Sequence, residues 1–176
     1  PGKELLDSLK EFLELDNLPI IAEDLGIINQ EVINLRKEYS LPGMKILQFA
    51  FDGNKDNPYL PQNIHGKNWV VYTGTHDNST TLSWWDQLDK DTKSNIQKEH
   101  NLSDNPSWKL IELGMKSKAN LFIAPIQDIL SLDDSCRTNK PGTTENNWKW
   151  KIRSTLNEIK PSLEKYGKFS RKYFRA

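Results

Sequence analysis

Two carboxylates follow apolar stretches at separate places in the chain, a pattern typical of a catalytic centre. Glu23 ends the apolar run in IIAEDLG, residues 20–26, and Asp77 in GTHDN closely follows the apolar run at residues 69–72. Two carboxyl groups that converge on one pocket suit glycosyl transfer or hydrolysis: one protonates the departing oxygen, and anions stabilise an oxocarbenium-like transition state. Apolar walls such as Ile21 would raise the pKa of Glu23 towards that of a proton donor, whereas polar neighbours would keep Asp77 ionised.

Simpler interpretations of these residues stay open. An acid after a strand is more often a helix cap or a surface residue than a catalyst. His76 beside Asp77 could ligate a metal ion, but His65 and His100 lie in unhelpful contexts and no H-x-H or H-E-x-x-H motif occurs, so we expect no metal. Cys136 lies in a polar loop without a neighbouring base, which predicts an inert thiol.

Aromatic and basic residues give weaker signals. Most aromatic side chains lie in a core, and we expect only one of four tryptophans to stack on a sugar ring: Trp84, Trp85, Trp148 or Trp150. The basic residues near the C-terminus are interrupted by Pro161 and Gly167 and predict a solvated helix face, not a nucleic-acid site.

The elements that must position these residues alternate between strand and helix. Apolar runs predict strands at residues 18–23, 44–51, 69–73 and 120–126. Helical periodicity predicts a helix at residues 3–15 and a second one that begins after an N-cap at Asn29. Helical or mixed sequence covers residues 80–117, with a break near Ser103–Pro106, and the C-terminal residues are also predicted to be helical. Polar loops are predicted at 52–68 and 131–147.

This alternation, with nearly continuous apolar strands, predicts an α/β fold with a parallel sheet covered by helices. Chemistry in such folds gathers at the carboxyl ends of the strands, where we expect both Glu23 and Asp77. Neighbouring residues of a strand point to opposite faces, so at most one of Glu23 and Asp24 can face a cleft. The other is free to bind backbone amides.

Composition excludes several classes of protein. Lys and Arg together number 24, as do Asp and Glu, so nothing global favours nucleic acid or an anionic membrane as a partner. A single cysteine excludes an internal disulfide. No apolar run approaches the roughly 20 residues of a membrane span, and no secretory signal opens the chain. We therefore expect a cytoplasmic protein, with a plastid as an alternative compartment.

Six strings in order resemble the amylomaltases, the 4-α-glucanotransferases or disproportionating enzymes of glycoside hydrolase family 77. They are LPIIAEDLG, LPGMKILQFAFDG, NPYLPQN, VVYTGTHDNSTT, LGMKSKANLFIAPIQDIL and RTNKPGTTENNWKW. The resemblance covers nearly all of residues 5–153, and six motifs in register are far more specific than any single carboxylate.

The resemblance implies an α-amylase-type TIM barrel that acts on malto-oligosaccharides and α-1,4-glucans by a retaining mechanism, without metal or organic cofactor. By motif, Glu23 is similar to the family's acid/base and Asp77 to its transition-state stabiliser. His76 matches the histidine that binds sugar hydroxyls, and Phe49 and Asn139 match positions that line the acceptor and donor grooves. The four predicted strands would be barrel strands five to eight.

One departure from the family pattern is large. The family's nucleophile lies in an Arg-x-Asp motif on strand four, and no Arg-x-Asp occurs in this chain. Residues 1–176 therefore resemble the C-terminal part of a single catalytic barrel, without the N-terminal half that carries the nucleophile, and we expect the isolated chain to be inactive. A smaller departure is Asn146, which replaces a usual glycine and tolerates a left-handed backbone better than most residues.

Two alternatives from other classes remain. A metal-dependent barrel hydrolase would use His76 and Asp77, and its activity would be sensitive to chelators. A non-catalytic glucan-binding remnant would still bind starch after Glu23→Gln.

Overall fold

The computed structural model describes residues 1–102 and 105–175. Along the chain lie α1 (Gly2–Leu13), α2 (Gln30–Glu38), β1 (Gly43–Ile46), β2 (Trp69–Tyr72), α3 (Thr81–Gln87), α4 (Lys90–His100), α5 (Pro106–Lys116), β3 (Leu121–Ile123), α6 (Ile126–Ile129) and α7 (Leu156–Lys172). Short 3₁₀ turns occupy Leu47–Phe49, Pro61–Asn63 and Asp134–Cys136. The predicted helical break falls between α4 and α5, although Ser103 and Asp104 themselves lie outside the described residues.

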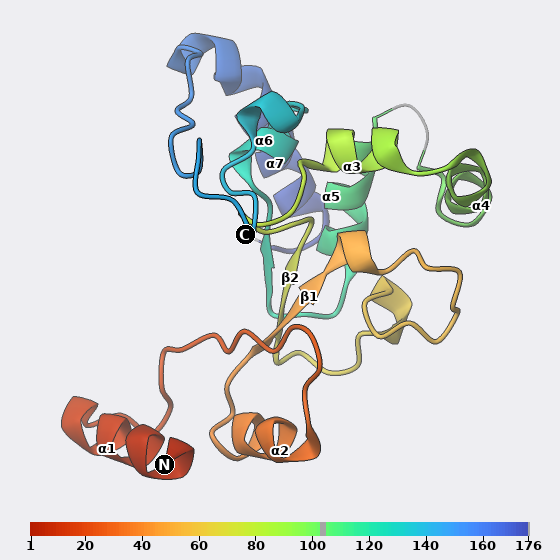
Figure 1. The fold of residues 1–176 in the computed structure, drawn as a ribbon. Helices are drawn as coiled ribbons and strands as arrows, with labels where there is room; N and C mark the ends of the chain where they lie inside the picture. The colour runs from red at the N-terminus through yellow and green to blue at the C-terminus, as the bar shows by residue number, and fades with distance from the viewer. Residues whose placement is uncertain (103–104, 176) are drawn as a thin grey trace.

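A parallel three-stranded sheet in the order β1-β2-β3 confirms the predicted α/β class (Figure 1). Met44 pairs with Val70, and Val70 pairs with Leu121. The observed strands are shorter than predicted. Strand β1 gives way to a 3₁₀ turn at Leu47, and β3 ends at Ile123, three residues before α6 begins.

The predicted strand at residues 18–23 is wrong as an element of this structure, because these residues have no strand assignment. Burial nevertheless alternates along them with the period of two expected of an extended chain: Leu18 is buried, Ile20 and Ala22 are half-buried, and Ile21 and Glu23 are exposed. Ala22 N–H donates to Pro42 O at 2.8 Å, beside the first residue of β1. The segment thus lies against the sheet's edge but does not continue its ladder.

Helix boundaries follow local capping chemistry. Asn29 caps α2 as predicted, since its side chain accepts from Val32 N–H at 2.9 Å. Thr155 and Glu158 form a capping box that starts α7. Contrary to expectation, α7 continues through Pro161, because Phe169 further along the helix packs against Trp108 of α5 with ring centroids 5.5 Å apart. Asn146 has a φ of 59°, which confirms that this position needs a left-handed backbone.

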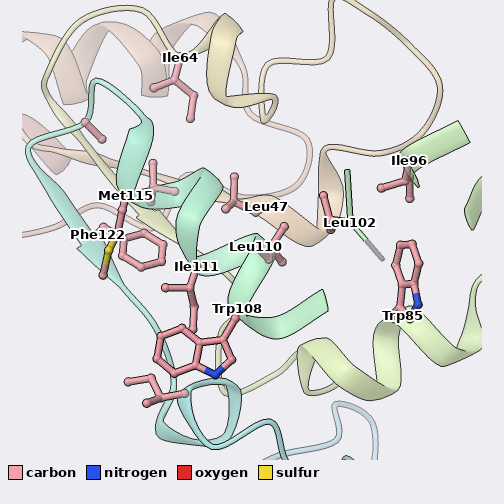
Figure 2. Close-up of a cluster of buried hydrophobic side chains, with 13 residues drawn as sticks. Leu47, Ile64, Trp85, Ile96, Leu102, Trp108, Leu110, Ile111, Met115 and Phe122 are labelled. Carbon is pink, nitrogen blue, oxygen red and sulfur yellow. The ribbon is translucent and has the colours of Figure 1, made fainter. Parts of the chain in front are cut away.

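The main core lies between one face of the sheet and helices α3 to α6. Figure 2 shows Met115, Ile111 and Trp108 of α5 with Phe122 of β3 in this cluster. Gly114 permits the approach, since a Cβ there would lie 2.1 Å from the Phe122 ring. A second, smaller cluster of Leu18, Tyr39 and Leu41 holds α1 and α2, which lie apart from the other helices in Figure 1.

The opposite face of the sheet is partly open. Leu121 and Ile123 of β3 expose 44% and 37% of their surface, whereas Phe122 between them is buried. An apolar sheet face normally packs against another layer. Val70 and Ile46 share this face through the strand register and are buried, so among the described residues the exposure of this face lies at β3.

A search of the described residues for membrane spans found no helix with the length and apolar character needed to cross a bilayer.

Candidate active site

Residues 73–80, the Asp77 loop, connect β2 to α3 and carry His76 and Asp77. Buried contacts hold both ends of this loop. Asp128 accepts hydrogen bonds from the Thr73 hydroxyl at 2.5 Å, from Thr81 N–H at 2.7 Å and from the Thr81 hydroxyl at 2.8 Å. Gln48 Nε2, which follows β1, donates to Ser79 O at 2.9 Å. The loop is therefore fixed by the end of β1 and by α6 as well as by its own strand.

Asp128 is an unusual support, because only 2% of its surface is exposed and no cation pairs with it among the described residues. Burial raises its pKa, while the hydrogen bonds from Thr73 and Thr81 act in the opposite direction. A buried carboxylate needs such donors to offset the loss of water. Nothing in the sequence pattern identified Asp128 or Gln48.

A second loop, residues 137–148 or the Asn139 loop, lies against the Asp77 loop. Arg137 joins the two: its Nε donates to Asn139 O at 2.8 Å, its Nη1 donates to the Ser79 hydroxyl at 3.1 Å, and its Nη2 donates to the backbone carbonyl of Asp77. Arg137 lies in the RTNKPG string, but spacing alone gave no reason to single it out. The Arg137 side chain therefore holds the two loops together, and we call it the clasp.

Three of the predicted residues meet where these loops touch. Asn139 Nδ2 donates to Asp77 Oδ1 at 2.6 Å, and Asn139 N–H donates to His76 O at 3.1 Å. His76 Nε2 lies 3.3 Å from Asp77 Oδ1. About half of each of the His76 and Asp77 side chains is exposed, so both are open to a ligand.

Trp148 adds an aromatic surface to this group. Its ring centroid lies 4.8 Å from that of His76, and 65% of the residue is exposed. An exposed indole beside hydrogen-bonding side chains suits a sugar, whose C–H face packs on a ring while its hydroxyls bind polar groups. Trp148 is thus the tryptophan that best fits the predicted stacking role.

An open cavity of about 870 Å³ adjoins the same group. Ser79, Arg137, Asn139, Lys140 and Asn147 are among its lining residues. Its volume falls in the usual range of small-molecule sites, and its lining is mainly polar, as a neutral polyhydroxylated ligand requires.

Glu23 lies elsewhere, beside the beginning of β1. Its neighbour Asp24 accepts from Met44 N–H at 2.7 Å and lies 3.2 Å from Arg36 Nε. Asp24 therefore binds a backbone amide, as predicted for one of the two acids, and Glu23 occupies the exposed face of the segment with Ile21. The expected apolar wall is not formed among the described residues, since Ile21 is 43% exposed.

Phe49 lies in the 3₁₀ turn after β1 and exposes 44% of its surface. Its ring meets that of Tyr59 edge-on, with centroids 5.6 Å apart, and its carbonyl accepts from Asn57 Nδ2 at 2.8 Å. The structure thus brings together His76, Asp77 and Asn139, while Glu23 and Phe49 lie at two other places along the edge strand. The expected meeting of Glu23 and Asp77 at one rim, and the catalytic roles of both, stay predictions.

The described residues offer few side chains that could bind a metal ion together. No group of three His, Cys, Asp or Glu side chains suited to a metal ion occurs in the part of the chain that the structure describes. His76 and Asp77 supply two ligand atoms, fewer than a zinc site requires.

Comparisons with known proteins agree on one family. A family model described as 4-alpha-glucanotransferase matches residues 1–157. The chain is 47% identical over 157 residues to the chloroplastic/amyloplastic 4-alpha-glucanotransferase of Arabidopsis thaliana, covering 88% of the chain and 27% of that protein. It is 48% identical over 153 residues to the 4-alpha-glucanotransferase of Synechocystis sp., covering 86% of the chain and 30% of that protein.

The fold agrees with the sequence similarity. The solved structure of an amylomaltase from Streptococcus agalactiae in complex with acarbose superposes with a TM-score of 0.88 at 30% identity. The superposition covers 100% of the chain and 35% of that protein. The chain therefore spans about a third or less of the length of these relatives.

Proposed function

Because the chain belongs to the 4-alpha-glucanotransferase family, we propose that the protein containing it transfers α-1,4-glucan segments between malto-oligosaccharides. The observation that carries the proposal is the cluster of His76, Asp77 and Asn139 beside the exposed Trp148 ring at an open polar cavity. A carboxylate, an amide and an imidazole bind sugar hydroxyls, and the indole supports the apolar face of the ring. A related amylomaltase is named as a complex with acarbose, which is consistent with a saccharide in this family's site.

In the proposed mechanism, Glu23 gives a proton to the departing glycosidic oxygen while an upstream carboxylate attacks the anomeric carbon. Asp77 favours the positive charge that develops on the sugar, and His76 and Asn139 bind its hydroxyls. In the second half, Glu23 takes a proton from the 4-hydroxyl of the acceptor glucan, which displaces the upstream carboxylate. Transfer exceeds hydrolysis when the acceptor excludes water, and Trp148 is placed to hold a sugar there. This chemistry requires no metal or organic cofactor.

The proposal includes the architecture. Residues 1–176 form the C-terminal part of one catalytic barrel, in which residues 18–23 supply strand five and β1, β2 and β3 supply strands six to eight. The exposed apolar side chains of Leu121 and Ile123 in β3 support this, because barrel strands bury both faces. Residues 18–23 are joined to the edge of the sheet through the backbone of Ala22. An upstream strand on their other side would give them a full set of strand hydrogen bonds.

The proposed compartment is the cytoplasm of a bacterium or a plastid. Relatives from both bacteria and chloroplasts are consistent with either.

The test is to incubate the parent protein with maltotriose and to measure glucose, longer oligosaccharides and total reducing ends. Transfer releases glucose and forms longer maltodextrins while the number of reducing ends stays constant. Reducing ends that rise in step with glucose would instead identify a hydrolase. Loss of activity on dialysis against a chelator would favour the metal-dependent alternative.

The 176-residue chain alone, assayed in parallel, should release almost no glucose, because its sequence lacks the Arg-x-Asp nucleophile motif. Glucose release by the short chain at a rate similar to that of the parent protein would overturn the assignment of the nucleophile to an upstream strand.

A further inference from the structure

A compact charged cluster lies under the segment that carries Glu23, and the proposed mechanism does not use it. Its members are Asp24, Arg36, Lys45 and Trp69. The Arg36 and Asp24 side chains expose only 8% and 11% of their surface. Two cations, Arg36 and Lys45, lie over the Trp69 ring at 4.3 Å and 4.2 Å from its centroid. Asp24 is the carboxylate that faces this pair.

Arg36 and Asp24 each have polar partners in or beside the cluster. Arg36 Nη1 donates to Leu41 O at 3.0 Å, and Arg36 Nε lies 3.2 Å from Asp24 Oδ2 without the alignment of a hydrogen bond. Burial lowers the pKa of Lys45, and the charge of Asp24 opposes this shift. A buried arginine beside a half-buried lysine requires a counter-charge, and Asp24 supplies it.

The arrangement leaves Asp24 little freedom to move. Its Oδ1 accepts from Met44 N–H at 2.7 Å, and its Oδ2 faces Arg36. A Cβ at position 43 would lie 2.5 Å from Asp24 Oδ2, so Gly43 leaves room for the carboxylate. The residue two positions earlier, Ala22, is also fixed, by its hydrogen bond to Pro42 O.

Glu23 lies between these two fixed points. Because burial alternates along the segment, Glu23 is directed to the face opposite Ala22 and Asp24. We infer that Asp24, held by Arg36 and by the backbone of Met44, is a positioning residue that fixes the direction of the Glu23 side chain for proton transfer. This inference rests on the proposed function, in which Glu23 is the acid.

The consequence is a specific kinetic defect. A displacement of about 1 Å in a catalytic group can lower a rate about a hundredfold. A natural glucan needs the proton from Glu23, because its sugar leaving group is poor. A 4-nitrophenyl glycoside needs it much less, because nitrophenolate departs without protonation.

The experiment compares Asp24→Ala, Asp24→Asn and wild type in the full-length parent protein, with Asp16→Asn as the control at an exposed acid of the preceding turn. Asp24→Ala should lower kcat on maltotriose about 10- to 100-fold. The first-turnover burst of 4-nitrophenol from 4-nitrophenyl α-maltoside should change by less than about threefold. Asp24→Asn keeps an acceptor for Met44 N–H but loses the counter-charge. Its kcat on maltotriose should therefore lie between those of wild type and Asp24→Ala.

Three outcomes overturn the inference: kcat of Asp24→Ala on maltotriose within about threefold of wild type, an equal loss on both substrates, or an Asp24→Asn variant as active as wild type. If Asp24→Ala does not fold, the Asn variant decides by the same comparison of substrates. Glu23→Gln separates this inference from the proposed function. It should lower maltotriose transfer about 10²- to 10⁴-fold, and an unaffected Glu23→Gln variant would contradict the acid role itself.

Discussion

The Asp77 loop and the segment that carries Glu23 differ in how this chain holds them. The Asp77 loop is connected to three other parts of the chain through Gln48, Asp128 and Arg137, and both of its ends are buried. The Glu23 segment is held along one side only, at Pro42 and Met44, and its outer face is exposed.

One half of the proposed site is therefore supported within this chain, and the other half is not. The group of His76, Asp77 and Asn139, which we propose binds sugar, has its supports within residues 43–148. The proposed acid lies on an edge that a further strand would cover. Substitutions around Asp77 should therefore affect binding and stability through contacts already present, in the order of effect that follows.

The largest expected effect is that of Asp77→Asn in the parent protein. Loss of the negative charge beside the developing oxocarbenium ion should lower kcat on maltotriose about 10²- to 10³-fold. The melting temperature should hardly change, because the side chain is half exposed. Asp91→Asn, at an exposed acid of α4, is the control and should behave as wild type. Comparable activity in the Asp77 and Asp91 variants would remove Asp77 from the mechanism.

Asp128→Ala should lower the free energy of unfolding by about 3 kcal/mol, because it leaves one buried N–H and two hydroxyls without their acceptor. Asp128→Asn keeps an oxygen that can accept from Thr81 N–H, so its free energy of unfolding should fall by less. Urea unfolding of both variants measures the difference. Equal stability of Asp128→Ala and wild type would mean that the Asp77 loop is not held from α6.

Arg137→Lys should lower kcat/KM on maltotriose about tenfold, because a single ammonium cannot reproduce the three hydrogen bonds of Arg137, two of which join the two loops. Arg171→Lys, on an exposed position of α7, is the matched control. A wild-type kcat/KM for Arg137→Lys would show that the clasp does not position Asp77 and Asn139.

The smallest effect concerns pH. Because burial raises the pKa of Asp128, the folded protein keeps this proton at pH values where the unfolded chain, with an ordinary pKa near 3.8, has lost it. The stabilising contribution is complete below pH 3.8 and is lost as pH rises through the folded pKa. The stability of wild type relative to Asp128→Asn should therefore decrease as pH rises through this window. If the stability of wild type relative to Asp128→Asn instead increased with pH, the hydrogen bonds from Thr73 and Thr81 would have a larger effect on the pKa of Asp128 than burial has.

Local chemistry made several elements predictable. The apolar runs identified β1, β2 and β3, because buried parallel strands need continuous apolar residues. Asn29 was predictable as a cap and Asn146 as a left-handed residue, since each preference arises within a few bonds of the backbone. The family motifs singled out both Asn139 and Asp77, and the structure shows that these two side chains are hydrogen-bonded although they lie 62 residues apart.

Other features depend on neighbours distant in the sequence. The run at residues 18–23 has strand composition, but a strand also needs a ladder partner, and composition cannot supply one. Pro161 disfavours a helix locally, and packing of α7 on α5 outweighs it. Asp128 and Gln48 carry no local signal, because their roles arise only when α6 and β1 approach the Asp77 loop.

The α/β class, three strands, the family and the candidate acids could all be predicted from the sequence, because these depend on residue type and order along the chain. The folded structure was needed to show that Arg137 and Asp128 hold the Asp77 loop, that Trp148 lies beside His76, and that Asp24 is held next to Glu23 by Met44 N–H. Hydrogen bonds and ion pairs act over a few ångströms, and the distances that control them are set by folding rather than by separation in sequence.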